Sequence, residues 1–313
     1  HLATMNRIGQ SIQSVLEQAQ KAKKVAGVLR QATTKKKNDF LLALADLLEK
    51  NTENILVENS KDMFSVSGLT NAMKRRLELT AQSVGAIAQG VREIAKLEDP
   101  VGKVAKEWTR PNGLRIVRVR VPIGVIASIF ESRPNVIIDV AALCVKSGNA
   151  VIVRGGKEAQ HSNNALMACI TKALEKSGLP IDSVQQLEDR RHEAVGELVQ
   201  LEDYLDLVTP RGREELIRAV SEKSRVAVMK HNRGLCHLYI DSDADIEKGI
   251  RIAVNAKVSN PSVCNSIETL LVHKDIADNI MPKLLEQLFE KGVEVRGDNR
   301  TCAYNARCVP ATD

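Results

Sequence analysis

The chain has 313 residues, enough for about two domains, and its 43% hydrophobic and 27% charged residues are ordinary for a soluble globular protein. The net charge is +6, but basic and acidic residues are interspersed and aromatic residues make up only 3%, so we expect no nucleic-acid partner. No apolar run is long enough for a membrane span, and the N-terminus lacks a secretory pattern. The six cysteines lack disulfide-framework spacing, which favours a cytoplasmic protein.

The first hundred residues are predicted to be mainly helical. Apolar residues recur at three- and four-residue spacing, with charges between them, in residues 11–29, 36–63 and 81–97. Within residues 111–124, aliphatic residues alternate with arginines after a Pro-Asn-Gly turn. This alternation predicts a strand with one solvent-exposed face.

Short apolar runs then alternate with helical patterns. Strands are predicted at residues 124–131, 150–156, 183–189, 204–212 and 225–230, with helices at 134–149, 159–180, 191–201 and 213–224. Repeated strand–helix units with short links predict a parallel sheet covered on both faces. A second region of this kind begins at Gly234.

Two glycine turns qualify as phosphate sites at the carboxyl ends of predicted strands. Gly155 and Gly156 lie between Arg154 and Lys157, and the pair Arg211–Gly212 opens a helix. Backbone N–H groups, a helix dipole and nearby cations suit an anion. The alternative is that the glycines only make tight turns and the cations are solvated. No Walker loop or G-x-G-x-x-G fingerprint is present.

Cys264 stands in a polar loop, "NPSVCNS", ahead of an apolar run. A thiol in such a loop is a better nucleophile candidate than Cys144 or Cys169, which lie among apolar helix positions. A buried, inert thiol is the alternative. Cys302 and Cys308 have no third ligand at metal spacing, so no metal site is predicted. Spacing selects no single base for Cys264 among three histidines: His231, His237 and His273.

Residues 121–163, "VPIGVIASIFESRPNVIIDVAALCVKSGNAVIVRGGKEAQHSN", resemble the signature block of the gamma-glutamyl phosphate reductase family, a branch of the aldehyde dehydrogenase superfamily. The stretches 210–212, 234–245 and 260–273 follow in the family's order, and the likeness runs from Met5 to Asp313. It implies an α/β fold with a Rossmann-type parallel sheet for the cofactor and a second α/β catalytic domain. Two domains are expected. Residues 5–233 form a helical N-terminal region and the NADP-binding domain, with a subunit-pairing strand near residues 112–121. Residues 234–313 form the catalytic domain.

The resemblance also implies the reaction. Members of the family, also called glutamate-5-semialdehyde dehydrogenases, reduce L-glutamyl 5-phosphate with NADPH to glutamate 5-semialdehyde, NADP and phosphate, the second step of proline biosynthesis. A homo-oligomer is expected, and a glutamate kinase is the candidate protein partner. A cation at Lys157, where NAD-preferring superfamily members carry a glutamate, would welcome the 2′-phosphate of NADP.

Carried over position by position, the resemblance makes Cys264 the nucleophile and Asn135 the candidate oxyanion donor. Glu131 and Arg133 are candidate contacts of the glutamyl phosphate. The residues expected at the cofactor are Arg154, Gly155, Gly156, Lys157, Ser162, Arg211 and Gly212.

Two departures shape the alternatives. His231 stands where hydrolytic aldehyde dehydrogenases place a glutamate that activates water, which fits an acyl-phosphate reductase because that reaction uses no hydrolytic water. The family also continues for about a hundred residues beyond Asp313, the length of a small domain, so we expect a C-terminally incomplete catalytic domain. The alternatives are a general NAD(P)-dependent aldehyde dehydrogenase and a non-catalytic chain that retains cofactor binding.

Overall fold

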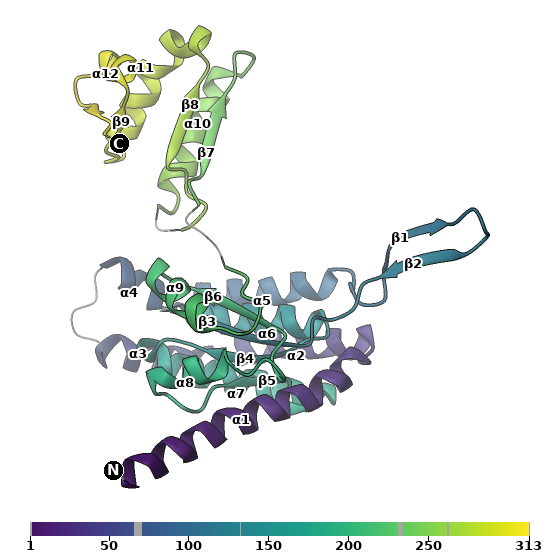
Figure 1. Ribbon diagram of the computed structural model, residues 1–313. Helices are drawn as coiled ribbons and strands as arrows, with labels where there is room; N and C mark the ends of the chain where they lie inside the picture. The colour runs from purple at the N-terminus through teal and green to yellow at the C-terminus, as the bar shows by residue number, and fades with distance from the viewer. Residues whose placement is uncertain (1, 66–70, 132, 231–233, 262, 313) are drawn as a thin grey trace. The chain divides into compact units, whose positions relative to one another are not determined.

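The computed structural model describes residues 2–65, 71–131, 133–230, 234–261 and 263–312 (Figure 1). The chain divides into two compact units, residues 1–231 and residues 232–313, and each is described by itself. No helix in the described ranges combines the length and apolar character needed to cross a bilayer.

Within the described residues, five helices form the N-terminal part of the first unit, where the apolar spacing predicts three helical stretches. The predicted stretch 36–63 is divided at Asn51, whose side chain donates back to Leu47 O at 2.6 Å. Thr33 accepts a hydrogen bond from Lys36 N, and Thr80 begins a capping box, so sequence-local caps fix two of the helix starts. The helices are α1 (Leu2–Arg30), α2 (Thr34–Lys50), α3 (Thr52–Ser65), α4 (Asn71–Leu77) and α5 (Ala81–Lys96).

A buried ion pair ties the start of α2 to the end of α5. Lys37 Nζ lies 2.5 Å from Asp99 Oδ2, and the lysine side chain is 1% exposed. Thr34 Oγ1 and Val101 N also donate to Asp99, at 2.8 and 3.0 Å. Burial alone would raise the pKa of Asp99, but the hydrogen bonds from Lys37, Val101 and Thr34 lower it below its ordinary value.

The predicted parallel sheet is confirmed. Its strand order is β5-β4-β3-β6, and every pairing is parallel. All six residues of β3 are buried, and because alternate residues point to opposite faces, both faces of this strand are covered. The strands are β3 (Val125–Phe130), β4 (Ala150–Arg154), β5 (Val184–Gln186) and β6 (Leu207–Arg211), and the helices are α6 (Asn135–Lys146), α7 (Gln160–Ser177), α8 (His192–Leu198) and α9 (Glu214–Lys223), with short 3₁₀ turns at Lys157–Ala159 and Ile181–Ser183.

The strand predicted at residues 225–230 is reduced to a single bridge. Val228 pairs in parallel with Val208, which donates to Ala227 O and accepts from Met229 N, each at 2.9 Å. The apolar alternation here is real, but the segment contacts the sheet over too short a length to form a full strand.

A two-stranded antiparallel ribbon, β1 (Val104–Thr109) and β2 (Arg115–Val119), extends away from the first unit (Figure 1). Its second strand was predicted, and its first was not. The prediction of a single wet face is wrong: all six residues of β1 are exposed, and only Ile116 and Val117 of β2 are half-buried. The aliphatic side chains of the ribbon are therefore not packed into a hydrophobic core.

The second unit is a small α/β assembly, as expected after Gly234. β7 (His237–Ile240) and β8 (Thr269–Val272) pair in parallel, and the buried core lies on α10 and α11, around Ile250, Ile280 and Leu284. The remaining elements are α10 (Ile246–Val258), α11 (Lys274–Glu290), β9 (Arg296–Gly297), α12 (Asn299–Tyr304) and β10 (Val309–Pro310), and β9 pairs with β10 in parallel.

Candidate active site

Strand register brings the two predicted phosphate turns to one edge of the sheet. Ile129 of β3 lies opposite both Arg154 of β4 and Pro210 of β6, and Phe130 lies opposite Arg211. The carboxyl ends of these three parallel strands therefore meet side by side, which is where ligands bind in open α/β sheets.

The turn after β4 is tightly packed and contains the cations Arg154 and Lys157 together with Glu158. A Cβ at Gly155 would lie 2.3 Å from Asn163 Nδ2 and 3.1 Å from Phe130, so this position has no room for a side chain. Arg154 donates to the carbonyl oxygens of Gly155 and Arg190, yet its buried Nε has no partner among the described residues. Burial and then the neighbouring Arg190 lower the pKa of Arg154, whereas Glu158 and Asp189 raise it, so charges of both signs surround this guanidinium.

Lys157 begins the 3₁₀ turn that leads from this glycine pair into α7. Its side chain is exposed, and within the described residues it forms no ion pair. Two features of this turn fit an anionic dinucleotide: the guanidinium Nε of Arg154 without a partner and the exposed ammonium group of Lys157, both judged within the described residues.

The N-terminus of α7 is already occupied by a carboxylate of the chain itself. Asp62 of α3, 1% exposed, accepts from His161 N at 2.9 Å, from Ser162 N at 2.8 Å and from Ser162 Oγ at 2.6 Å. The Ser162 hydroxyl also accepts from Asn59 Nδ2 at 3.0 Å and is fully buried. The expected cofactor contact of Ser162 stays a prediction, and what the geometry shows is a buried cap.

A carboxylate also lies beside the residue that precedes α9. Glu131, which follows β3, accepts from Arg213 N at 3.0 Å, and its carboxylate lies 3.6 Å from Arg213 Nε. A Cβ at Gly212 would lie 2.8 Å from Glu131 Oε2 and 2.9 Å from Leu216, so a larger residue here would displace the ends of these two side chains. The side chain of Arg211 is exposed at the same edge. The role of Glu131 in substrate binding stays a prediction.

Arg133 and Asn135 lie at the start of α6 and are half-buried. Asn135 Nδ2 donates to Asp139 Oδ2 at 3.1 Å, one helical turn further along. The oxyanion role of Asn135 and the substrate contact of Arg133 are not tested by this arrangement.

In the second unit, Cys264 is exposed in the loop that joins α10 to β8. Ser266 Oγ donates to Ala256 O at 3.3 Å, and Ile267 N donates to the same carbonyl at 3.2 Å. Cys236, just before β7, donates its thiol to Cys264 O at 3.3 Å. The backbone around the Cys264 thiol is therefore tied to two regular elements.

Cys264 differs chemically from the thiols buried in the first unit. Burial raises the pKa of Cys144 to about 12 and also raises the pKa of Cys169, so both stay protonated and inert. Cys264 is open to solvent, and its backbone N–H has no acceptor within the described residues. The exposed thiol and the adjacent unpaired donor are the two parts that attack on a carbonyl requires.

Neither His237 nor His273 forms a hydrogen bond with Cys264, so the structure does not select a base between them. His237 Nδ1 lies 2.6 Å from Leu235 O, and His273 Nδ1 accepts from Asp275 N at 3.2 Å. His231, with the interpretation attached to it, lies outside the described residues.

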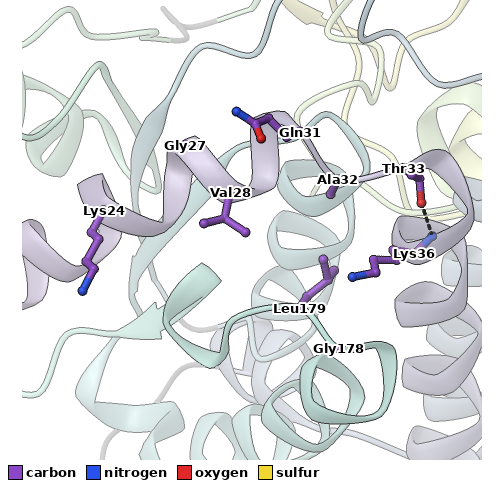
Figure 2. A pocket seen from close by; sticks show the side chains of 9 residues that line it. All are labelled: Lys24, Gly27, Val28, Gln31, Ala32, Thr33, Lys36, Gly178 and Leu179. Atoms are coloured by element: carbon purple, nitrogen blue, oxygen red, sulfur yellow. Dashed lines mark hydrogen bonds between the residues drawn. The ribbon is translucent and has the colours of Figure 1, made fainter.

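Two pockets lie elsewhere in the first unit. One, of about 420 Å³, is formed by the end of α1, the start of α2 and Gly178–Leu179 (Figure 2). The other, of about 280 Å³, lies at the base of the ribbon and includes Asn149, which precedes β4. Leu179 and Asn149 precede β5 and β4, so both pockets belong to the amino side of the strands, away from the edge with the glycine turns.

Sequence reasoning missed the side chains that hold these turns in place. Asp62 and Asn59 lie on a helix a hundred residues before the α7 start that Asp62 caps. Cys236 is 28 residues from Cys264. No spacing rule connects such pairs, and the local signal for Asp62 is that it shares the helix face of Ile55 and Asn59.

The comparisons with known proteins agree with this geometry. The model of the aldehyde dehydrogenase family matches residues 2–301. A gamma-glutamyl phosphate reductase of Moorella thermoacetica is 48% identical over 301 residues, which are 96% of this chain and 72% of that protein. One from Xanthomonas campestris is 46% identical over 290 residues, 92% of this chain and 70% of the relative.

Solved structures give the same picture. The crystal structure of gamma-glutamyl phosphate reductase from Thermotoga maritima superposes with a TM-score of 0.86 at 39% identity, over 96% of this chain and 73% of that one. A glyceraldehyde-3-phosphate dehydrogenase of Methanocaldococcus jannaschii, solved with NADP, shares the fold at 18% identity and a TM-score of 0.64, over 91% of this chain and 60% of that one. The expected α/β fold is confirmed, and the chain belongs to the aldehyde dehydrogenase family and, within it, to the gamma-glutamyl phosphate reductases.

Proposed function

We propose that the chain reduces L-glutamyl 5-phosphate to L-glutamate 5-semialdehyde with NADPH and releases phosphate, the second step of proline biosynthesis. The observation that carries this proposal is Cys264: an exposed thiol on an anchored loop, beside its own N–H, which has no acceptor among the described residues, in a chain 48% identical to a gamma-glutamyl phosphate reductase.

The chemistry begins at the Cys264 sulfur. Its thiolate attacks the carbonyl carbon of the acyl phosphate, the backbone N–H of Cys264 stabilises the negative charge that forms on the oxygen, and the C–O bond to phosphate breaks. The product is a thioester on Cys264. NADPH, when bound, supplies the hydride that brings this carbon to the aldehyde level, and the thiolate is then released. No water is activated, so no carboxylate base is required.

The cofactor residues are those of the carboxyl edge of the first unit's sheet. Arg154, Lys157 and Arg211 supply positive charge, whereas the space beside the glycines is filled by Asn163, Glu158 and Glu131 of the chain itself. Asp62 caps the start of α7, and Glu131 accepts from the N–H of Arg213, the residue that precedes α9. We therefore assign the phosphates mainly to the three cations. Lys157, which is exposed and forms no ion pair with the residues that the structure describes, favours the 2′-phosphate of NADPH over the bare ribose of NADH.

The same proposal includes self-association of the chain, its cellular compartment and a protein partner. The β1–β2 ribbon exposes Val104, Trp108 and Val119, which are 54%, 36% and 47% exposed, and a ribbon with no core of its own suits pairing with a second copy. The cysteine spacing favours the cytoplasm. Because an acyl phosphate is labile in water, the glutamate kinase that forms it is the candidate protein partner.

The test runs the reaction backwards, because the semialdehyde is the easier substrate to handle. The chain is incubated with glutamate semialdehyde and NADP, with and without inorganic phosphate, and NADPH formation is followed by absorbance. Phosphate-dependent formation is expected, and it should be abolished in Cys264→Ser and kept in Cys144→Ser.

Other outcomes separate the alternatives. NADPH formation without phosphate would identify a hydrolytic aldehyde dehydrogenase. NADPH binding without turnover in either direction would identify a non-catalytic chain that retains the cofactor site. Normal turnover by Cys264→Ser would refute the thioester route.

A further inference from the structure

Two thiols of the second unit, Cys302 on α12 and Cys308 just before β10, lie against each other. Their Sγ atoms are 3.3 Å apart, and Cys302 Sγ lies 3.5 Å from Gly297 O. A disulfide holds its sulfur atoms about 2.05 Å apart, so the two need to approach by only about 1.3 Å more.

The backbone holds both cysteines in this position. Cys302 N donates to Asp298 O at 2.9 Å, and Cys308 N donates to Asn305 O at 3.0 Å. Val309 and Pro310, which follow Cys308, pair in parallel with Arg296 and Gly297 of β9. The approach of the two sulfur atoms is therefore set by hydrogen-bonded structure on both sides.

Gly297 provides the space that the pair occupies. A Cβ at this position would lie 3.1 Å from Cys308 Sγ and 2.6 Å from Thr301 Cβ. A larger residue would push Cys308 or α12 away and separate the thiols.

The two thiols are not equivalent. Cys308 is 8% exposed, and burial followed by the neighbouring Cys302 raises its pKa to about 11. Cys302 is half-buried. A reagent from solution therefore reaches Cys302 first, and the more buried Cys308 is the resolving cysteine.

We propose that Cys302 and Cys308 are a site of reversible oxidation that takes a low-molecular-weight disulfide as its oxidant. In the first step, Cys302 sulfur bonds to one sulfur of the reagent, whose S–S bond breaks and releases one thiol. In the second step, Cys308 sulfur attacks Cys302 sulfur and displaces the other half as a second thiol. The chain is oxidised by two electrons, the reagent is reduced by two, and both cysteine protons leave on the released thiols.

This site is independent of the proposed catalysis, because neither cysteine belongs to the nucleophile loop or to the cofactor turns. In a reducing cytoplasm the pair rests as two thiols, and it closes when oxidised thiol pools rise. Closure links α12 to β10 covalently.

Trypsin gives a direct readout. It cleaves after Arg300 and after Arg307, which places Cys302 on the peptide of residues 301–307 and Cys308 at the start of the next one. The folded chain is incubated with oxidised glutathione, free thiols are blocked with iodoacetamide, and the digest is analysed by mass spectrometry. We expect the two peptides joined, at their summed mass less two hydrogen atoms, and separated again after dithiothreitol.

Three variants complete the experiment. Cys302→Ser and Cys308→Ser should each abolish the joined peptide while keeping the wild-type circular dichroism spectrum, and Cys264→Ser should leave its yield unchanged. The proposal is overturned if the folded wild-type chain yields Cys302 and Cys308 only as free thiols or separate glutathione adducts. It is equally overturned if either cysteine is found joined to Cys264 instead.

Discussion

Replacing Asp62 tests the buried network that supports the cofactor turn. Its carboxylate accepts two backbone N–H groups and one hydroxyl at the start of α7, within 2.6–2.9 Å, and is 1% exposed. In Asp62→Ala, His161 N and Ser162 N lose their acceptor. Each buried donor left unsatisfied costs about 1–3 kcal/mol, so we expect a loss of about 3–5 kcal/mol in the free energy of unfolding.

Asp62→Asn should fall in between. Its amide oxygen accepts one of the donors, but its NH₂ group then faces another, and we expect a loss of about 2 kcal/mol. The consequence for function is local: because the turn with Gly155 and Lys157 leads directly into α7, fraying of this helix start should also weaken NADPH binding.

The measurement is urea unfolding followed by far-ultraviolet circular dichroism. With a slope near 3 kcal/mol per molar urea, the midpoint of Asp62→Ala should fall by about 1 M or more. Ser60→Ala, an exposed position on the same helix, is the matched control and should move the unfolding free energy by no more than about 0.5 kcal/mol. An Asp62→Ala midpoint as close to the wild type as that of the control would refute the argument.

Three further predictions follow from single contacts. Lys157→Glu should weaken NADPH binding by about tenfold or more and narrow its preference over NADH in fluorescence titrations, whereas Lys157→Arg should keep both affinities; equal NADPH affinity in all three proteins would contradict the 2′-phosphate assignment. Asp99→Asn leaves Lys37 buried and unpaired and should cost about 3–5 kcal/mol at neutral pH. The pKa of Asp99 is lowered in the folded state, so its contribution to stability is present above its unfolded pKa and is lost as the pH falls through the folded value. The difference in unfolding free energy between wild type and variant should therefore shrink from about pH 5 to pH 3 in urea titrations. A constant difference would rule out this carboxylate as its source. Cys236→Ala removes the donor to Cys264 O and should change the rate of Cys264 alkylation at a fixed pH, with Cys236→Ser partly restoring the wild-type rate; identical rates for all three proteins would show that the Cys236 thiol does not position the loop.

Local patterns in the sequence were sufficient for the main elements of the fold. The apolar runs at residues 124–131 and 150–156 became β3 and β4, because a strand buried on both faces must be apolar along its length. The position of the glycine turns was predictable for a second reason: parallel strands place their carboxyl ends at one edge of the sheet. Cys264 stood out because a polar loop is a poor place to bury a thiol.

Only the tertiary structure decided which partners the helix starts and thiols receive. Asp62 reaches Ser162 from a hundred residues away, and Glu131 reaches Arg213 from 82, so the donors that the glycine turns were expected to offer a phosphate are partly used within the chain. The β1–β2 ribbon likewise packs against no core, although the alternation of aliphatic residues and arginines in its second strand predicts one buried face. Periodicity and turn chemistry are local properties and determine where elements begin and end, whereas the pairing of groups distant in sequence depends on how those elements pack.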